Sequence, residues 1–174
     1  MLNVAAAPAA VSFRAVQAPL PKVRLATNAD LDEIVSLGCD LHKENGLMKM
    51  DENAILQAAM NAVAGKDGVV GVIGAPGHIE GLIFLQWRQY WYAKHPHLEE
   101  LLNYVKPEFR RSQNAKALLE FAKEAADRLG AVLLIGVLSN ERTKAKIRLY
   151  ERQFGAAAGA FFLYGSKTGK VSQR

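Results

Sequence analysis

The strongest structural signal in this chain is the segment YVKPEFRRSQNAKALL at residues 104–119. Pro107 lacks the backbone N–H that a sheet ladder requires, so it closes the strand that residues 98–106 predict. Beyond it the apolar spacing becomes helical up to Gly130, a residue typical of helix ends. The helical apolar positions are Leu118, Phe121, Ala122, Ala125 and Leu129. The segment is therefore a strand that leads into an amphipathic helix through a polar, basic turn.

This turn has the features of an anion-binding site. The first amides of a helix have no intrahelical acceptor, and their partial positive charge faces whatever lies at the N-terminus. Arg110, Arg111 and Lys116 add positive charge there. A solvent-exposed turn with basic residues on its rim is the alternative, and the segment alone leaves both interpretations open.

The elements on both sides of the turn predict an α/β chain with strands and helices mixed along the sequence. Caps, Gly-rich turns and apolar periodicity mark their boundaries. In chain order we expect a strand at 23–26, helices beginning at Thr27 and Asp51, strands at 69–73, 79–87 and 98–106, a helix ending at Gly130, a strand at 131–138, a basic helix at 141–153 and a strand at 160–164. The order is β-α-α-β-β-β-α-β-α-β.

Length and composition limit the class of protein. The 174 residues and 19.0 kDa suit a single domain, and 50% hydrophobic residues against 22% charged residues indicate a folded core rather than disorder. No uncharged run reaches the roughly 20 residues of a membrane helix, so we expect no membrane partner. The net charge of +5 favours an anionic partner, and nucleotide, nucleic acid and phosphorylated cofactor all remain open.

Cysteine usage and the chain ends give further expectations. The single Cys39 excludes an internal disulfide and a thiolate cluster, so a reducing, cytoplasmic location fits best. We expect residues 1–22 to be a flexible extension, 23–166 the domain and 167–174 a loose tail. A partner-contacting arm or a targeting segment is the alternative for the N-terminal residues. We expect no metal, because His95 and His97 have no carboxylate at helical ligand spacing.

The order Pro-Glu-aromatic-Arg, a short turn and an Ala-Leu-Leu helix resembles the acyl-CoA-binding motif of the GNAT superfamily of N-acyltransferases, Gln/Arg-x-x-Gly-x-Gly/Ala. Arg110 matches its first position and Ala115 its last, while Gln113 stands where the first glycine belongs. The resemblance implies that backbone amides of the turn bind the CoA pyrophosphate. It leaves open whether Gln113 weakens that binding. The implied cofactor-binding residues are Val105, Arg110, Arg111, Ser112, Gln113, Asn114, Ala115, Lys116 and Asn140.

A second segment, RLYERQFG at residues 148–155, resembles the later motif of the same superfamily, in which an Asn after a strand precedes a Leu-Tyr helix. Asn140 and Tyr150 are the matching residues. The resemblance implies that Tyr150 is the general acid that protonates the departing CoA thiolate. The alternative is a packed aromatic side chain whose hydroxyl bonds a backbone carbonyl.

Attack by an amine requires a base, because the amine must be neutral. Some members of the superfamily use a Glu on the strand before the phosphate turn, and Glu99 and Glu100 lie there. Side chains alternate along a strand, so only one of them can face the acceptor cleft. We favour Glu99, with Glu100 and then Glu80 as alternatives.

The resemblance covers about residues 23–164. It implies an α/β (α+β) fold whose mixed, mainly antiparallel sheet has six to seven strands and about four flanking helices. It implies transfer of an acetyl or other acyl group from acetyl-CoA to an amine, without a metal and with an unidentified acceptor. The compact shape, the phosphate turn without its glycine and the short final strands look most like the small GNAT proteins encoded by phages and prophages. The alternative is a catalytically inactive GNAT-fold protein that binds a host or partner protein.

Two surface features have open interpretations. The aromatic loop at 87–97 fits an acceptor pocket, a homodimer contact or a cover for the sheet end. The basic helix face at 142–152 fits solvent exposure, the 3′-phosphate of CoA or an acidic partner. We do not expect nucleic acid as the partner, because aromatic residues are not interleaved with that basic face.

Overall fold

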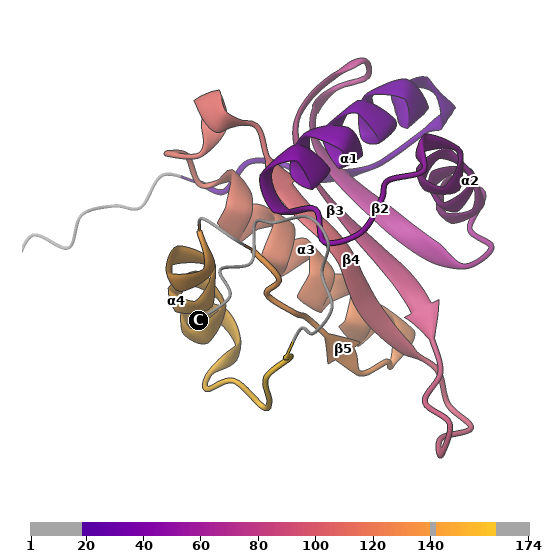
Figure 1. Cartoon of the computed structure of the whole chain (residues 1–174), viewed down its shortest axis with the longest axis vertical. Coiled ribbons are helices and arrows are strands. Elements are labelled where there is room, and N and C mark those ends of the chain that lie inside the picture. Colours follow the sequence, from indigo (N-terminus) through magenta and orange to yellow (C-terminus); the bar gives the residue numbers. More distant parts are fainter. Residues whose placement is uncertain (1–18, 140–141, 163–174) are drawn as a thin grey trace, which may run out of the picture.

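The computed structural model describes residues 19–139 and 142–162, in which helices cover both faces of a central sheet (Figure 1). In chain order the elements are β1 (Arg24–Leu25), the 3₁₀ helix η1 (Asn28–Asp30), α1 (Leu31–Asn45), α2 (Glu52–Val63), β2 (Gly68–Ala75), β3 (His78–Arg88), β4 (His97–Val105), the 3₁₀ helix η2 (Pro107–Phe109), α3 (Asn114–Leu129), β5 (Leu133–Leu134) and α4 (Thr143–Phe154).

The strands form one sheet in the order β1-β2-β3-β4-β5. The first four strands pair antiparallel, whereas β5 runs parallel to β4 and pairs only through Leu98 with Leu133 and Glu99 with Leu134. The β2–β3 turn contains Gly77 at a φ of 75°, a conformation that glycine adopts without the strain of a Cβ. The predicted hairpin is confirmed by this turn and its flanking strands.

The sheet separates two apolar cores. On one face, Ile34 and Leu37 of α1 and Ala59 of α2 pack against residues of β2, β3 and β4. On the other face, the buried residues of α3 pack with Tyr150 of α4 against side chains that point the opposite way. Period-2 alternation supplies both sets, so β2, β3 and β4 each contribute buried residues to both cores. Figure 1 shows α1 and α2 together on one side of the sheet.

Local signals set the helix ends as predicted. Asp51 caps α2 by accepting hydrogen bonds from the backbone N–H groups of Asn53 at 2.9 Å and Ala54 at 3.3 Å. Gly130 ends α3 at a φ of 60°, in the left-handed conformation typical of helix C-termini. Thr27 and Asp30 form a capping box before α1.

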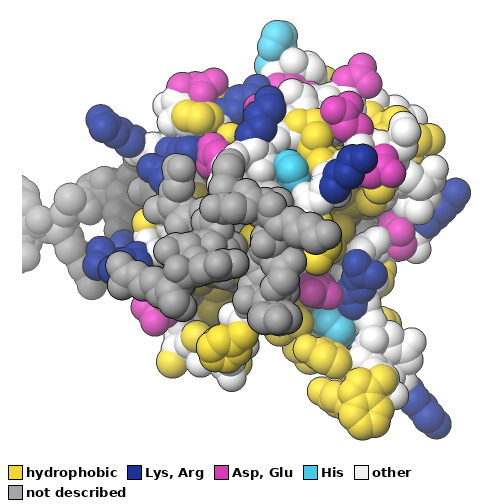
Figure 2. Space-filling model, viewed as in Figure 1, with side chains coloured by type: hydrophobic (Ala, Val, Ile, Leu, Met, Phe, Trp, Pro, Cys, Tyr) yellow, Lys and Arg dark blue, Asp and Glu magenta, His cyan; other side chains and the backbone are white. Residues whose placement is uncertain are grey.

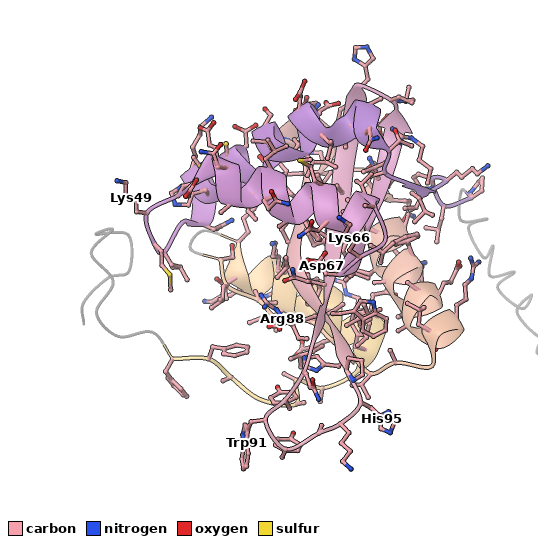
Figure 3. All side chains as sticks on the ribbon, turned by 90° about the vertical axis from the view of Figure 1, so that its right-hand side faces the viewer. Lys49, Lys66, Asp67, Arg88, Trp91 and His95 are labelled. Carbon is pink, nitrogen blue, oxygen red and sulfur yellow. The ribbon has the colours of Figure 1, made fainter. Side chains whose placement is uncertain are left out.

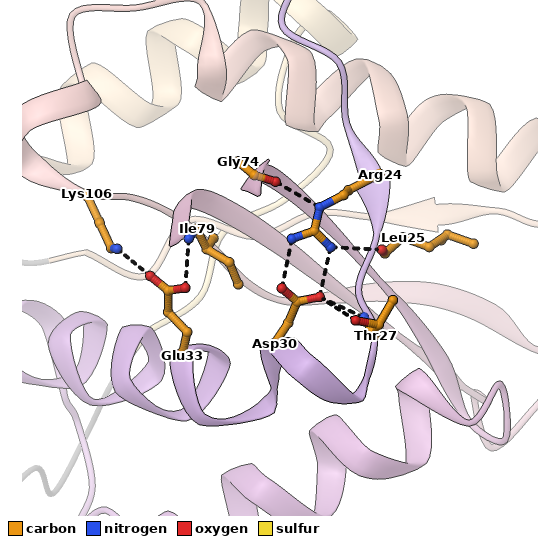
Figure 4. Close-up of polar contacts among 8 residues, drawn as sticks. All are labelled: Arg24, Leu25, Thr27, Asp30, Glu33, Gly74, Ile79 and Lys106. Carbon is orange, nitrogen blue, oxygen red and sulfur yellow. Dashed lines mark hydrogen bonds and ion pairs between the residues drawn. The ribbon is translucent and has the colours of Figure 1, made fainter. Parts of the chain in front are cut away.

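Two carboxylates of the α1 region tie that helix to the sheet (Figure 4). Asp30 is fully buried, and its carboxylate accepts hydrogen bonds from both terminal nitrogens of Arg24 at 2.8 Å. This hydrogen-bonded guanidinium holds the pKa of Asp30 well below its usual range. Glu33 accepts Lys106 Nζ at 2.5 Å and the Ile79 N–H at 2.7 Å. The start of the turn after β4 is therefore fixed to α1.

The sheet differs from the prediction at its C-terminal side. The described residues form five strands rather than six to seven, and the expected strand at 131–138 is reduced to the two half-buried residues of β5. Residues 160–162 are not a strand, and the rest of the expected strand at 160–164 lies outside the described residues. So do most of the 1–22 extension and the whole 167–174 tail. Among the described helices, none is both long and apolar enough to span a bilayer.

Candidate active site

Hydrogen bonds within the turn between β4 and α3 involve its backbone and the Ser112 side chain. The Ser112 N–H donates to the Phe109 carbonyl at 3.1 Å, and Ser112 Oγ donates to the same oxygen at 2.6 Å. Ser112 Oγ also accepts the Asn114 N–H at 3.0 Å. Ser112 therefore acts as the cap of α3, and the side chain of Gln113 makes no cap bond.

Several amides at this turn stay available to a ligand. Within the described residues, four backbone N–H groups between η2 and the first turn of α3 donate to no acceptor, those of Arg111, Gln113, Ala115 and Lys116. The N–H groups of Ser112 and Asn114, also predicted to bind the cofactor, are used inside the turn. The unpaired amides lie at a helix N-terminus, where partial positive charge favours an anion.

The Arg110 side chain is bonded within the protein, where it positions the turn. Its Nε donates to the Val105 carbonyl at 2.8 Å, and its Nη2 donates to Glu44 of α1 at 2.5 Å. The guanidinium carbon lies 5.1 Å from the centroid of the Tyr104 ring. Arg110 thus connects the end of β4 with α1, and the Val105 carbonyl is occupied by this contact.

Asn114 has a similar positioning role. Its side chain is buried, and its Nδ2 donates to Glu80 Oε2 of β3 at 2.8 Å. The first residue of α3 is therefore fixed to the sheet. Glu80, the last of the predicted base candidates, is engaged in this contact.

Gln113 does not need the conformational freedom of the glycine that it replaces. Its φ and ψ are −85° and 4°, which any residue can adopt, and no non-glycine residue of the described ranges has a positive φ. The backbone at this position therefore does not require the φ values that only glycine adopts freely. The side chain of Gln113, through its volume or its polar groups, is therefore what distinguishes this position from a glycine.

A β-bulge in β4 sets the direction of the catalytic candidates. The pairing with β3 jumps between Phe84–Leu102 and Leu85–Glu100, so Leu101 is the extra residue. Strict alternation would point Glu100 and Asn103 to opposite faces. Because of the bulge, both side chains face α4.

Glu100 and Asn103 meet Tyr150 of α4. The Tyr150 hydroxyl lies 3.0 Å from both carboxylate oxygens of Glu100, to which it donates, and it accepts Asn103 Nδ2 at 3.3 Å. Burial raises the pKa of Glu100 to about 7, against the lowering effects of Lys146 and of the Tyr150 hydrogen bond. Burial and the Glu100 charge raise the pKa of Tyr150 above its usual range. At neutral pH the tyrosine carries its proton and the carboxylate titrates.

Glu99 occupies a different position. It lies 3.7 Å from Arg88 Nε of β3, and its side chain is 39% exposed. The structure thus places Glu100, rather than the favoured Glu99, against Tyr150.

Lys146 lies on α4 one turn before Tyr150 and is half-buried. Its Nζ donates to the Asn103 carbonyl at 3.3 Å. Burial lowers the pKa of Lys146, while the nearby charges of Glu100 and Glu44 raise it. The other basic residues of this helix face, Arg142, Lys144, Arg148 and Arg152, are exposed.

A cavity of about 220 Å³, here called the turn-side cavity, lies between α1, α4 and the end of β4. Its wall includes Ala115 of the turn between β4 and α3, and Tyr150 of α4. The charged residues that line it are Glu44, Arg110, Arg142 and Lys146. Positive charge therefore predominates in the turn-side cavity.

A second cavity of about 180 Å³, the strand-side cavity, lies along β4 where residues 135–139 diverge from it. Its charged residues are Glu99, Glu100 and Lys146, so negative charge predominates. Asn103 and Lys146 line both cavities, whereas Tyr150 belongs to the first and Glu100 to the second. The Glu100–Tyr150 hydrogen bond therefore crosses the wall between a basic and an acidic cavity.

The sequence interpretation gave no role to Asn103 or Glu44, and it placed Lys146 only on the basic helix face. A polar Asn inside an apolar strand, and the i,i+4 spacing of Lys146 and Tyr150, were the available signals. Predicted residue Asn140 lies outside the described residues. The described residues contain no group of three or more His, Cys, Asp or Glu placed to hold a metal ion.

The aromatic loop forms the tip of the β3–β4 hairpin. Trp91 and His95 project away from the body of the molecule (Figure 3), and hydrophobic side chains gather at this tip (Figure 2). Tyr90 stacks on His97 with ring centroids 4.8 Å apart, while Trp91 is 93% exposed. None of the residues lining the two cavities comes from the tip, so it is not part of either wall.

Comparison with known proteins gives a family and a set of similar folds. A family model described as the acetyltransferase (GNAT) family matches residues 35–156. No curated protein matches the chain.

Several solved structures have a fold similar to that of this chain, at low sequence identity. AAC(6′)-Iy in complex with the bisubstrate analogue CoA-S-monomethyl-acetylneamine is 16% identical, with a TM-score of 0.65 over 84% of this chain and 97% of that one. A possible acetyltransferase from Clostridium difficile 630 is 19% identical, with a TM-score of 0.64 over 84% and 98%. An integron cassette protein from the mobile metagenome of Cole Harbour Salt Marsh is 22% identical, with a TM-score of 0.63 over 83% and 90%.

Proposed function

The chain belongs to the GNAT family of acetyltransferases and is an N-acetyltransferase. From this premise we propose that its two cavities bind the two substrates of the reaction separately. The turn-side cavity takes the acyl-CoA, the strand-side cavity takes the acceptor amine, and the Glu100–Tyr150 pair moves the proton between them. The hydrogen bond between these two residues across the cavity wall is the observation that carries the proposal.

The turn-side cavity suits the anionic substrate. Arg110, Arg142 and Lys146 outnumber the single carboxylate of Glu44 in its lining, and Ala115 joins it to the unpaired amides of the turn. Those amides and the N-terminus of α3 are complementary to a diphosphate. The side chains of Arg110 and Asn114 act here as positioning residues, because both are bonded within the protein.

The strand-side cavity suits a cationic acceptor. Glu99 and Glu100 give it negative charge, and Leu134, Leu138 and Phe161 give it apolar wall. An amine that arrives as an ammonium ion is attracted by the carboxylates. It must then lose one proton to solvent before it can attack.

Glu100 and Tyr150 together then transfer a proton from the amine nitrogen to the leaving sulfur. When the neutral amine attacks the thioester carbonyl carbon, the C–N bond forms and the C–S bond breaks. Glu100 takes the surplus proton from nitrogen, and Tyr150 gives its hydroxyl proton to the sulfur. Protonated Glu100 returns a proton to Tyr150 through their 3.0 Å hydrogen bond, which restores both residues. A base with a pKa near the working pH suits this exchange.

Tyr150→Phe tests the acid role. We expect turnover to fall by on the order of 10²-fold, the lower range for a positioned acid or base, while acetyl-CoA affinity measured by titration calorimetry stays nearly constant. Unchanged turnover would remove Tyr150 from the mechanism. If acetyl-CoA at millimolar concentration gives neither heat nor a thermal shift, the inactive partner-binding alternative replaces the enzyme.

Three further expectations from the sequence remain predictions. They are the resemblance to phage and prophage members, the cytoplasmic location and the homodimer contact through the aromatic loop. Size-exclusion chromatography with light scattering of Trp91→Ala beside the native protein tests the dimer.

A further inference from the structure

Lys146 lies where the two cavities meet. Its side chain lines both of them, and it stands one helical turn from Tyr150 on the same face of α4. Its Nζ makes one hydrogen bond, to the Asn103 carbonyl, and no ion pair of Lys146 occurs within the described residues. Most lysines lie at the surface, so an amine held at this junction calls for an explanation.

We propose that Lys146 is a self-acylation site, whose Nζ takes the acyl group from acyl-CoA bound in the turn-side cavity. The proposal rests on the proposed function, since it requires the thioester to lie beside Tyr150. Lys146 would then be an amine that the protein itself presents to its own acyl donor.

The surrounding groups supply the chemistry. Burial lowers the pKa of Lys146, so more of this amine is neutral than of an exposed lysine. The neutral Nζ attacks the thioester carbonyl carbon, the N–C bond forms and the C–S bond breaks. Glu100 takes the surplus proton from nitrogen and Tyr150 donates one to the sulfur, so the products are acylated Lys146 and CoA thiol.

Acylation changes the junction in two ways. It removes the positive charge beside Glu100, and it places an acyl group where the cavities connect. The strand-side cavity becomes narrower and more negative. An acylated chain would therefore discriminate among acceptor amines differently from an unmodified one.

The test is incubation of the full chain with isotopically labelled acetyl-CoA, followed by peptide mass spectrometry over time. Labelling counts only newly added acetyl groups. Lys144, which is exposed two residues earlier on α4, is the internal reference, and Lys144→Arg is the matched control variant. Binding of acetyl-CoA is measured by calorimetry on the same preparation.

We expect Lys146 to be labelled more than about tenfold faster than Lys144, because it shares a site with the thioester. The rate constant should not depend on protein concentration. Lys146→Arg should abolish the label at that position, Lys144→Arg should leave it unchanged, and Glu100→Gln should slow it on the order of 10²-fold.

Labelling of Lys146 at the rate of Lys144, in a sample that binds acetyl-CoA, overturns self-acylation while the acyltransferase proposal stands. If Glu100→Gln does not slow labelling of Lys146, self-acylation is also overturned, because Lys146 would then react with acetyl-CoA without help from the site. Absence of acetyl-CoA binding overturns both proposals.

Discussion

Replacing Glu100 by glutamine should stabilise the folded protein at alkaline pH while it removes most of the activity. The reason is that Glu100 is a carboxylate buried beside Tyr150 and raised in pKa to about 7 from an ordinary 4.5. A buried carboxylate that a site needs for catalysis lowers the free energy of unfolding of the protein.

The size and sign of the effect follow from that difference. Below pH 4.5 Glu100 is protonated in the folded and unfolded states, and its pKa has no effect on stability. Between pH 4.5 and 7 the unfolded carboxyl ionises first, so folding becomes less favourable as the pH rises. Above pH 7 the full penalty applies, about 3 kcal/mol at 1.36 kcal/mol per pKa unit.

Glutamine recovers only part of this energy. Its carbonyl oxygen can still accept the Tyr150 hydroxyl, but its amide N–H groups need acceptors in a largely buried position. We therefore expect a gain of about 1–2 kcal/mol at pH 9, with the melting temperature rising by about 2–4 °C for each kcal/mol in a chain of this length. At pH 4.5 we expect little difference.

The assay is thermal unfolding followed by circular dichroism at pH 4.5 and pH 9. Glu99→Gln is the stability control, because Glu99 is a more accessible neighbour that lies beside Arg88, and its replacement removes a charge without relieving burial of a carboxylate beside Tyr150. Initial rates with acetyl-CoA measure the activity. If Glu100→Gln melts no higher than the native protein at pH 9, or if Glu99→Gln shows the same gain, the argument from burial of Glu100 is wrong.

Three substitutions test the surrounding framework. Gln113→Gly should tighten CoA binding in calorimetry, because it clears space beside the free amides; weaker binding would show that the Gln113 side chain contacts the cofactor. Asn114→Ala should leave Glu80 without its partner, lower stability by about 1–3 kcal/mol and weaken CoA binding, and unchanged values of both would argue against the positioning role. Arg24→Met should lower the free energy of unfolding by about 3–5 kcal/mol at neutral pH, because it leaves Asp30 buried and unpaired; the loss should shrink as acid protonates Asp30, and a loss independent of pH would contradict this.

Much of the fold follows from local signals. Asp51, Pro107 and Gly130 act through their own backbone chemistry, so the boundaries that they set could be read directly. The apolar run at 131–138 was a different case. Its composition predicts a strand, but pairing depends on a neighbour, and β5 ends where the chain leaves β4 after two residues.

The candidate site was predictable in its parts rather than in its arrangement. Tyr150 and the turn carry the motif residues, and Tyr150, Arg110 and Ala115 line the turn-side cavity. The choice between Glu99 and Glu100 depends on the bulge at Leu101, which has no signature in the sequence. Lys146 belongs to a basic helix face for which the sequence leaves solvent, the 3′-phosphate of CoA and an acidic partner open, and only tertiary packing shows that this side chain turns inward.

The two ion pairs from α1 have a consequence for ligand entry. Glu33 holds Lys106 and Glu44 holds Arg110, so a single rigid helix braces both ends of η2. The diphosphate would therefore meet a preorganised cradle, and little loop-ordering entropy would be lost on association.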